Sequence, residues 1–534
     1  MSIGLPGYEA AIAITVFATG TGGVVCLSSS PEEQTVDKGK GRIPSWLSGS
    51  LYRNGGGIFK MGDTRYRHMF DGLAVLHRWS ITDGKVTYLS SILDTDSYKK
   101  CVKADRLVGD GVGTSFPDPC RTIFNNFFSY FLPMDGFDNC AVNVVEHGDR
   151  LFALTESSLI HEVDGSTLLS QGKVNINKFV AVHLGTAHPH FGRDKSMYYY
   201  ATSPATSHRA YNIVKVPPPE KGEDLFSKAK IVASIPSRWH LNVGYTHSFG
   251  MSENYFIYFE LPVATNVPRV LTMKLWSGTI EDCMLNFPDE PIRIHVVRRD
   301  TGERLPIQFL APHGFVFHFI NCYEDSGFLI CDVCLFNSGS EVKQMYIDNV
   351  LEKLEKKIPG DSQFARFVLP LSLDKAKAGE NLITLPNVKA TAVLRPGTKN
   401  TVDVTHHVMF DKSYAFELPR INYDRNALNY RFVYASTVLR KHCPRLLKFD
   451  VQTLEVKEWR CEPNHMAGEP VFVKNPSGVE EDDGVILCPV LAETTNESSY
   501  LIVLDAGSFK ELGRATVPAH LKMSLTFHGD FYNR

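Results

Sequence analysis

The feature of this chain that most constrains its fold is the recurrence of short β-type segments from residue 50 onward. Representative segments, rich in β-branched and aromatic residues, are Lys85–Leu89, Arg150–Thr155, Tyr255–Glu260 and Leu501–Leu504. Glycine, proline and asparagine mark the turns between them, and this rhythm is typical of antiparallel sheets built from many short strands, as in a propeller. Because no sequence repeat of blade length is visible, the rhythm indicates an all-β fold without fixing the number of blades.

Length and composition favour one large globular domain. The 534 residues are enough for two or three average domains or for one repeat-built β domain, and no shift in composition marks a second domain. Hydrophobic residues make up 43% and charged residues 22%, which is an ordinary globular balance. The net charge is −3 and no lysine- or arginine-rich run occurs, so nucleic acid is not expected as a partner.

Cysteine usage predicts a cytoplasmic protein with reduced thiols. The 11 cysteines are odd in number and scattered, and several lie inside apolar runs such as 328–334. This pattern fits buried thiols better than a disulfide framework. Cys331 and Cys334 form a Cys-x-x-Cys pair, but no second pair with zinc spacing follows, so we interpret both as strand core.

The N-terminal 42 residues are expected to be an extension outside the folded domain, disordered or without assigned structure. Residues 10–27 carry no charge, and this uncharged stretch has the length of a marginal membrane-spanning or signal segment. The stretch contains three glycines and no basic residue precedes it. A mitochondrial transit peptide would be rich in arginine, whereas the first arginine is Arg42. An anchor, a disordered tail and a gene-model artefact all stay open.

One segment has a clear helical period. Ile347, Val350, Leu351 and Leu354 stand at i, i+3, i+4 and i+7, and Pro-Gly at 359–360 ends the segment. The sequence therefore predicts a short surface helix over 345–354.

Ten short motifs occur in a single order along the chain. Six of them are Ser50–Gly57 (SLYRNGGG), His68–Gly72 (HMFDG), Phe116–Cys120 (FPDPC), Ala415–Tyr423 (AFELPRINY), Gly468–Val473 (GEPVFV) and Glu480–Leu487 (EEDDGVIL). The other four contain the histidines of TAHPH (His188), YTHSFG (His247), FHFIN (His318) and TFHGDF (His528). Together they resemble the carotenoid cleavage oxygenase family, in its metazoan branch of β-carotene oxygenases and retinoid isomerohydrolases. The resemblance runs from about Ile43 to Phe531.

The resemblance implies both the fold and a metal site. The fold would be a seven-bladed β-propeller, formed by residues 43–534 as one domain, with loops and short helices capping the iron-bearing face. One Fe(II) would be bound by the family's four histidines, which are His188, His247, His318 and His528 here. Neutral imidazole is a common ligand of iron. Glu156, Glu417 and Glu469 would each accept the Nδ1–H of one ligand, leaving His188 without such a partner.

A second helical pattern bears on how a lipid-soluble substrate could enter. Phe124, Phe127, Phe128 and Phe131 share one stripe of the segment 123–133. The stripe either packs against a sheet edge or forms an apolar patch that contacts a membrane at a tunnel mouth, and Cys120 beside it is a candidate for palmitoylation. The second interpretation predicts peripheral membrane association.

By resemblance, the function is the oxidative cleavage of a carbon–carbon double bond in a carotenoid or apocarotenoid, with O2 as co-substrate and apocarotenals or retinal as products. Two alternatives stay open: a retinoid isomerohydrolase that acts on all-trans-retinyl esters, and a carotenoid-binding protein without catalysis. The chain departs from the family pattern at Gly56, where proline is usual, and at Met69, where tryptophan or leucine is commoner. Neither position is a ligand. The scissile bond and the oligomeric state are not fixed by the sequence.

Overall fold

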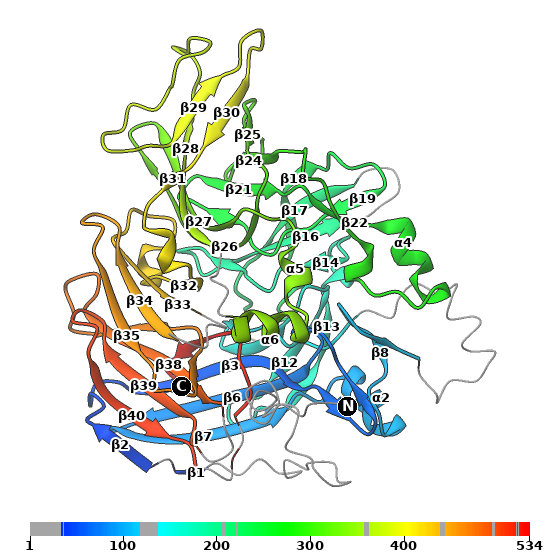
Figure 1. The fold of residues 1–534 in the computed structure, drawn as a ribbon, viewed down its shortest axis with the longest axis vertical. Helices are drawn as coiled ribbons and strands as arrows, with labels where there is room; N and C mark the ends of the chain where they lie inside the picture. Colours follow the sequence, from blue (N-terminus) through cyan, green and yellow to red (C-terminus); the bar gives the residue numbers. More distant parts are fainter. Residues whose placement is uncertain are drawn as a thin grey trace.

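A computed structural model gives the architecture of most of the chain (Figure 1). The structure describes residues 34–35, 37–117, 137–203, 209–220, 223–356, 362–437, 444–493, 497–518, 521 and 523–534. Helices are few in this part of the chain, and most residues in regular structure belong to strands.

Seven sheets of four or more strands in the described part of the chain make up the propeller blades. The first holds β1 (Gln34–Thr35), β7 (Lys85–Ile92), β6 (Leu73–Thr82), β3 (Gly49–Ile58) and β41 (His528–Tyr532). The second holds β10 (Asn143–His147), β11 (Arg150–Leu154), β12 (Leu159–Val163) and β13 (Ser170–Asn175). The third holds β14 (Leu184–Gly185), β15 (His190–Phe191), β16 (Met197–Ser203), β17 (Ala210–Val216) and β18 (Lys230–Pro236).

The remaining four blades come mostly from later stretches of the chain, and two strands within 391–405 join the fourth blade from between strands of the fifth. The fourth holds β20 (Gly250–Met251), β21 (Tyr255–Glu260), β24 (Ile292–Arg298), β25 (Gln308–Ala311), β30 (Thr401–Thr405) and β29 (Thr391–Leu394). The fifth holds β26 (Phe315–Asp325), β27 (Phe328–Phe336), β28 (Gln363–Pro370) and β31 (His407–Val408). The sixth holds β32 (Glu417–Arg420), β33 (Phe432–Ser436), β34 (Arg445–Asp450) and β35 (Val456–Arg460). The seventh holds β2 (Asp37–Gly41), β40 (Glu511–Thr516), β39 (Tyr500–Asp505), β38 (Gly484–Ala492), β36 (His465–Ala467) and β37 (Val471–Lys474).

Shorter elements connect or cover the blades. The small sheets are β19 (Asn242–Gly244) with β22 (Val263–Asn266) and β23 (Met284–Asn286), β4 (Lys60–Met61) with β5 (Thr64–Arg65), and β8 (Gly109–Asp110) with β9 (Ser115–Phe116). The helices are α2 (Asp96–Ala104), α4 (Val267–Thr272), α5 (Glu341–Gln344), α6 (Ile347–Lys356) and the 3-10 turns η1 (Ile176–Lys178), η2 (Met273–Leu275), η3 (Glu281–Cys283), η4 (Lys412–Tyr414) and η5 (Tyr423–Arg425). The four strands and the helix expected from the sequence are confirmed.

The ring closes by pairing the two ends of the chain. β41 lies antiparallel beside β3, with His528 opposite Asn54 and Gly529 opposite Arg53. The two strands approach so closely at Gly529 that a Cβ there would lie 1.9 Å from the carbonyl oxygen of Tyr52. This closure holds the last residues of the chain against the first blade, and it places His528 at the inner edge of that blade.

Two described strands, β1 and β2, lie before the expected boundary at residue 43. β2 pairs with β40 in the seventh blade, and β1 pairs with β7 in the first. These strands add backbone hydrogen bonds to sheet edges, and their polar sequences (QT and DKGKG) lack the apolar alternation by which strands are recognised. Residues 1–33 lie outside the described part of the chain.

Most blades bury both faces against their neighbours. All nine residues of β27 are buried, including Cys331 and Cys334, whose thiols are free. The one charged residue of this strand, Asp332, accepts two hydrogen bonds from Arg366, at 2.8 and 2.7 Å. The Cys-x-x-Cys pair is therefore strand core, as expected.

A cap of loops and helices lies over one face of the propeller. Ile347 and Val350 of α6 are buried in a cluster with Met69 and Leu107. His68 contacts the cap, because its Nε2 lies 2.8 Å from the carbonyl oxygen of Val342 in α5. No helix among the described residues is long and apolar enough to cross a bilayer.

Candidate metal centre

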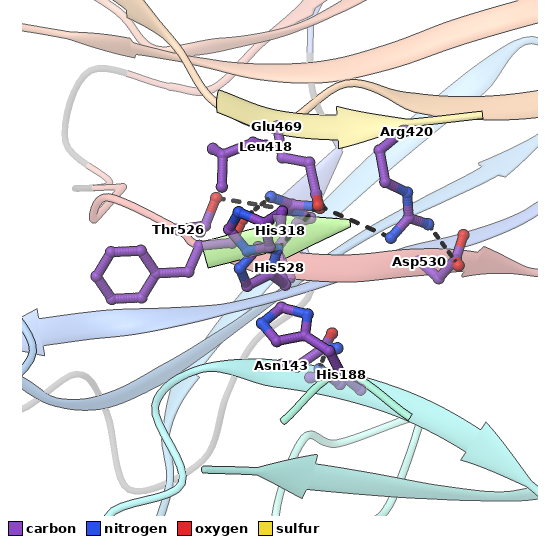
Figure 2. A network of polar contacts seen from close by, with 12 residues as sticks. Asn143, His188, His318, Leu418, Arg420, Glu469, Thr526, His528 and Asp530 are labelled. Carbon is purple, nitrogen blue, oxygen red and sulfur yellow. Dashed lines mark hydrogen bonds and ion pairs between the residues drawn. The ribbon is translucent and has the colours of Figure 1, made fainter. Parts of the chain in front are cut away.

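Four blades each bring one histidine to the centre of the ring from an edge of the sheet. His188 lies between β14 and β15, His247 lies just before β20, His318 lies within β26, and His528 begins β41. The register of β26 shifts on both sides of Phe319, and irregularities of this kind re-aim side chains next to functional sites. Figure 2 shows the imidazoles of His188, His318 and His528 turned toward one another from different strands.

The four imidazoles form one compact group. One nitrogen from each of His188, His247, His318 and His528 lies within 4.8 Å of the others. The Nε2 atoms of His188 and His247 are 2.8 Å apart. Two nitrogens on opposite sides of an ion with bonds of about 2.1 Å would lie about 4.2 Å apart, so the group has the dimensions of a single metal site.

Three of the four imidazoles contact a carboxylate through Nδ1. His318 Nδ1 lies 2.5 Å from Glu417 Oε2, and His528 Nδ1 lies 2.9 Å from Glu469 Oε1. His247 Nδ1 likewise bonds Glu156, which also accepts a hydrogen bond from the hydroxyl of Tyr245. An imidazole that donates Nδ1–H presents a bare Nε2, so these carboxylates fix the tautomer that binds a metal.

His188 has no such carboxylate among the described residues. Its backbone N–H donates to the Thr186 hydroxyl, and its ring faces the other three. The neighbouring His190 lies outside the group, with Nε2 at 2.9 Å from the carbonyl oxygen of Phe249. The pairing of glutamates and histidines thus has the pattern that the resemblance implied.

Glu469 anchors a charged network behind His528. It forms ion pairs with Arg53 at 2.5 Å and with Arg420 at 3.8 Å, and Arg420 also pairs with Asp530 at 2.5 Å (Figure 2). Burial raises the pKa of Glu469, but Arg420, Arg53 and His528 outweigh it and hold that pKa well below the ordinary value. Glu469 is therefore ionised, and Arg53 also ties the strand of His528 by donating to the carbonyl oxygen of Phe527 at 2.7 Å.

The residues present fit a divalent cation. Burial lowers the pKa of His528 to about 3 and that of His188 well below its ordinary value, so both rings are neutral ligands at pH 7. His318 Nε2 is buried without a hydrogen-bond partner and faces the group. Across the described network, four carboxylates (Glu156, Glu417, Glu469 and Asp530) stand against two guanidiniums, and a divalent ion would balance the remaining two negative charges.

One side of the centre is aromatic. The ring of Phe317 meets that of His247 edge-on at 5.3 Å, and the ring of Phe70 lies 6.4 Å from Phe317 and 5.7 Å from Phe527. Phe70 follows Met69 in the capping segment, so the cap contributes directly to this wall. The wall is apolar and can hold a hydrophobic substrate beside the imidazoles.

Sequence reasoning missed two arginines, one aspartate and one tyrosine hydroxyl of this network. Arg53, Arg420, Asp530 and Tyr245 all lie inside or beside the quoted motifs, yet nothing in their spacing predicts ion pairs between blades. The aromatic stripe of Phe124, Phe127, Phe128 and Phe131, with Cys120, lies outside the described residues, so its expected role stays a prediction.

The fold and the four-imidazole group define a class of propeller proteins with a central metal site. The family model described as retinal pigment epithelial membrane protein (RPE65) matches residues 27–533. The chain therefore belongs to the RPE65/carotenoid oxygenase family, and the resemblance stated from the motifs is confirmed.

Named relatives and solved structures agree with this membership. The chain is 36% identical to the β,β-carotene 15,15'-dioxygenase of Rattus norvegicus over 92% of this chain and 88% of that one. The corresponding values are 36%, 92% and 94% for the Gallus gallus protein, and 35%, 92% and 91% for the Homo sapiens protein. Among solved structures, an ACO/RPE65 chimera aligns with a TM-score of 0.75 at 24% identity, covering 95% of this chain and 97% of that one. Cobalt-substituted Synechocystis ACO aligns with a TM-score of 0.73 at 23% identity, covering 95% and 96%. These structures support the seven-bladed fold, which confirms that expectation.

Proposed function

We propose that the protein is an Fe(II)-dependent dioxygenase that cleaves one carbon–carbon double bond of a carotenoid or apocarotenoid. The observation that carries the proposal is the group of four imidazoles, three of them held by carboxylates, in a chain that matches named β,β-carotene 15,15'-dioxygenases over 92% of its length. His188, His247, His318 and His528 would hold the ion, which would supply the redox chemistry that dioxygen needs to react with an alkene.

The chain's own residues hold the site and place the substrate. Glu156, Glu417 and Glu469 keep three rings in the metal-binding tautomer. Phe70, Phe317 and Phe527 exclude water and hold a polyene beside the rings. In the overall reaction the double bond breaks and each carbon receives one oxygen atom of O2. The balance needs no net proton transfer, so the site requires no general acid or base.

We also propose that the protein docks on a lipid surface to collect its substrate. The segment of α4 and η2 exposes Leu271 (68%), Leu275 (69%) and Trp276 (42%), and Leu241 beside it is 62% exposed. Large apolar side chains gathered in this way suit insertion into the interface of a bilayer. A Leu271→Ser/Leu275→Ser variant should lose flotation with phosphatidylcholine vesicles while keeping its metal. Equal flotation of variant and wild type would refute this surface.

The cleavage reaction can be tested directly. The protein, loaded with Fe(II), is incubated aerobically with β-carotene in detergent, and the products are identified by mass spectrometry. Apocarotenals or retinal are the expected products, and their chain lengths identify the bond that is cut. No product at full iron occupancy would overturn the proposal.

The RPE65 family also fits an isomerohydrolase, so this alternative needs a test. The same assay, with a second substrate, separates it and the binding protein from the dioxygenase. In a parallel incubation with all-trans-retinyl ester, release of an isomerised retinol, with no cleavage of β-carotene, would favour the isomerohydrolase. Stoichiometric pigment binding without turnover of either substrate would favour a binding protein.

A further inference from the structure

A second polar site lies away from the metal centre, between the third and fourth blades. A hollow of about 380 Å³ is lined by residues that follow β18 and by residues of β24 and β25. Deeper in the same interface the two blades pack through aromatic rings, including Tyr200, Tyr211 and Tyr258. The hollow therefore forms where apolar packing between the blades gives way to polar side chains.

Three guanidiniums line this hollow, which we call the arginine pocket: Arg238, Arg293 and Arg304, with Glu260, His295, Ser237 and Asn400. Arg293 and His295 alternate with buried Ile292 and Ile294 along β24, so they share the face that meets the third blade. The carboxylate of Glu260 stands on the neighbouring strand, directly opposite Arg293 in register.

The one carboxylate on the pocket wall is already committed to other groups. Glu260 is fully buried and accepts hydrogen bonds from the Tyr211 hydroxyl at 2.8 Å and from the backbone N–H of Arg238 at 2.9 Å. His295 Nε2 lies 3.4 Å from its other oxygen, and Arg238 Nε lies 3.6 Å from that same atom. Arg238 in turn donates to the carbonyl oxygens of Pro291 and Leu261 and lies 3.5 Å from Glu290. Arg238 and Glu260 thus neutralise each other.

The other two guanidiniums have no such partner. Neither the guanidinium of Arg293 nor that of Arg304 makes a hydrogen bond or an ion pair with any residue that the structure describes, and Arg293 Nε is buried. Burial lowers the pKa of Arg238, Glu260 opposes this, and the positive charge of Arg293 lowers that pKa further, so Arg293 lies close to a like charge. A buried donor beside a like charge is costly unless an acceptor binds it.

We propose that the arginine pocket binds a phosphate group of a small phosphate ester. Two unneutralised guanidiniums match a phosphate, which carries about −1.5 to −2 charge at pH 7 and three acceptor oxygens. A carboxylate carries one charge and two oxygens, so a single guanidinium fork would satisfy it. Ser237 and Asn400 add polar groups to the wall, and a volume of about 380 Å³ leaves room for an organic part beside the phosphate.

The pocket is tested by calorimetric titration of the whole protein with inorganic pyrophosphate in low-salt buffer. We expect saturable binding that weakens at least about tenfold in Arg293→Gln and in Arg304→Gln, because each loses a charge-assisted contact. Arg460→Gln, which removes an exposed arginine from β35 in the sixth blade, should bind as the wild type does. Arg304 is exposed, so its variant keeps the test decisive even if Arg293→Gln folds poorly.

Three results would overturn the proposal: no saturable binding of pyrophosphate, equal binding by the wild type and both pocket variants, or tighter binding of citrate than of pyrophosphate. The source of the phosphate is read from a parallel experiment with phosphatidylcholine vesicles that do or do not contain phosphatidic acid. Flotation that phosphatidic acid increases in the wild type but not in Arg293→Gln assigns a lipid headgroup. Arg293-dependent binding of pyrophosphate without such flotation assigns a soluble ester. Either result supports the phosphate site, whatever the outcome of the cleavage assay.

Discussion

The metal centre and the arginine pocket are both polar clusters on the edges and faces of strands, but they treat charge in opposite ways. At the centre, the protons of three imidazoles meet carboxylates, and the most buried carboxylate, Glu469, meets two guanidiniums. In the pocket, Arg293 and Arg304 have no anionic partner among the described residues. Glu469 is almost fully buried, so water cannot compensate its charge, whereas Arg304 in the pocket is exposed. Burial therefore explains why Glu469 needs counter-charges from the protein, whereas water or a ligand can compensate the charge of Arg304.

The largest expected effect would break the centre itself. His247→Ala should lose both the bound metal and the cleavage activity, because it removes one of four ligands and leaves Glu156 without its imidazole. Metal per chain, measured by elemental analysis, and product formation are the two readouts. His190→Gln is the matched control, since His190 lies outside the group and bonds the carbonyl of Phe249. Retained metal and activity in His247→Ala would contradict the assignment.

The next prediction concerns how strongly metal affinity and stability at the centre depend on balanced charge. Glu469→Gln should weaken metal affinity about tenfold to a hundredfold and should lower stability by about 3–5 kcal/mol, because Arg53 is left buried without its anion. Glu417→Gln should weaken metal affinity similarly but cost less stability, since Glu417 pairs with His318 alone among the described charged groups. Chelator competition and thermal unfolding separate the two quantities. Equal losses of stability would show that the arginines do not depend on Glu469.

Acid should lower the stability of the folded chain through a buried imidazole of the first blade, that of His77 in β6, and not through the arginines. Burial lowers the pKa of His77 to about 3 from an ordinary value of 6.5, so between these values the unfolded chain binds more protons than the folded one. Stability should therefore fall as the pH drops from 6.5 toward 3. His77→Gln should flatten this dependence in urea unfolding, whereas Arg293→Gln should leave its slope unchanged, because arginine does not titrate in this range. An unchanged slope in His77→Gln would contradict the assigned cause.

The smallest effect is expected in the arginine pocket, where removing a charge should not lower stability as it does at Glu469. In phosphate-free buffer, Arg293→Gln should be neutral or stabilising by about 0.5 kcal/mol, because it removes a charge that faces Arg238 without a partner. Pyrophosphate should then raise the melting temperature of the wild type and not that of the variant. A clear loss of stability in Arg293→Gln without ligand would show that the charge is already balanced.

Much of the fold could be predicted from local sequence. The segment Tyr255–Glu260 matches β21 residue for residue, and the period of Ile347 and Val350 gives α6, because both patterns are set by side chains within one element. The strands β1 and β2 could not be found in this way, since their polar sequences are held by backbone pairing with β7 and β40. They lie before the expected boundary at residue 43, which stays a prediction.

The motifs quoted from the sequence already contain the four histidines that meet in the fold, His188, His247, His318 and His528, together with Glu417 and Glu469. Which charges meet depends on how distant strands pack together in the fold. Arg53 and Glu469 are hundreds of residues apart in the chain, and closure of the ring by β41 brings them to 2.5 Å. The arginine pocket likewise has no sequence signal, because a missing counter-charge is a property of three-dimensional neighbours. Hydrophobic periodicity depends on residues that are neighbours in the sequence, whereas electrostatic balance depends on every group within a few ångströms in the fold.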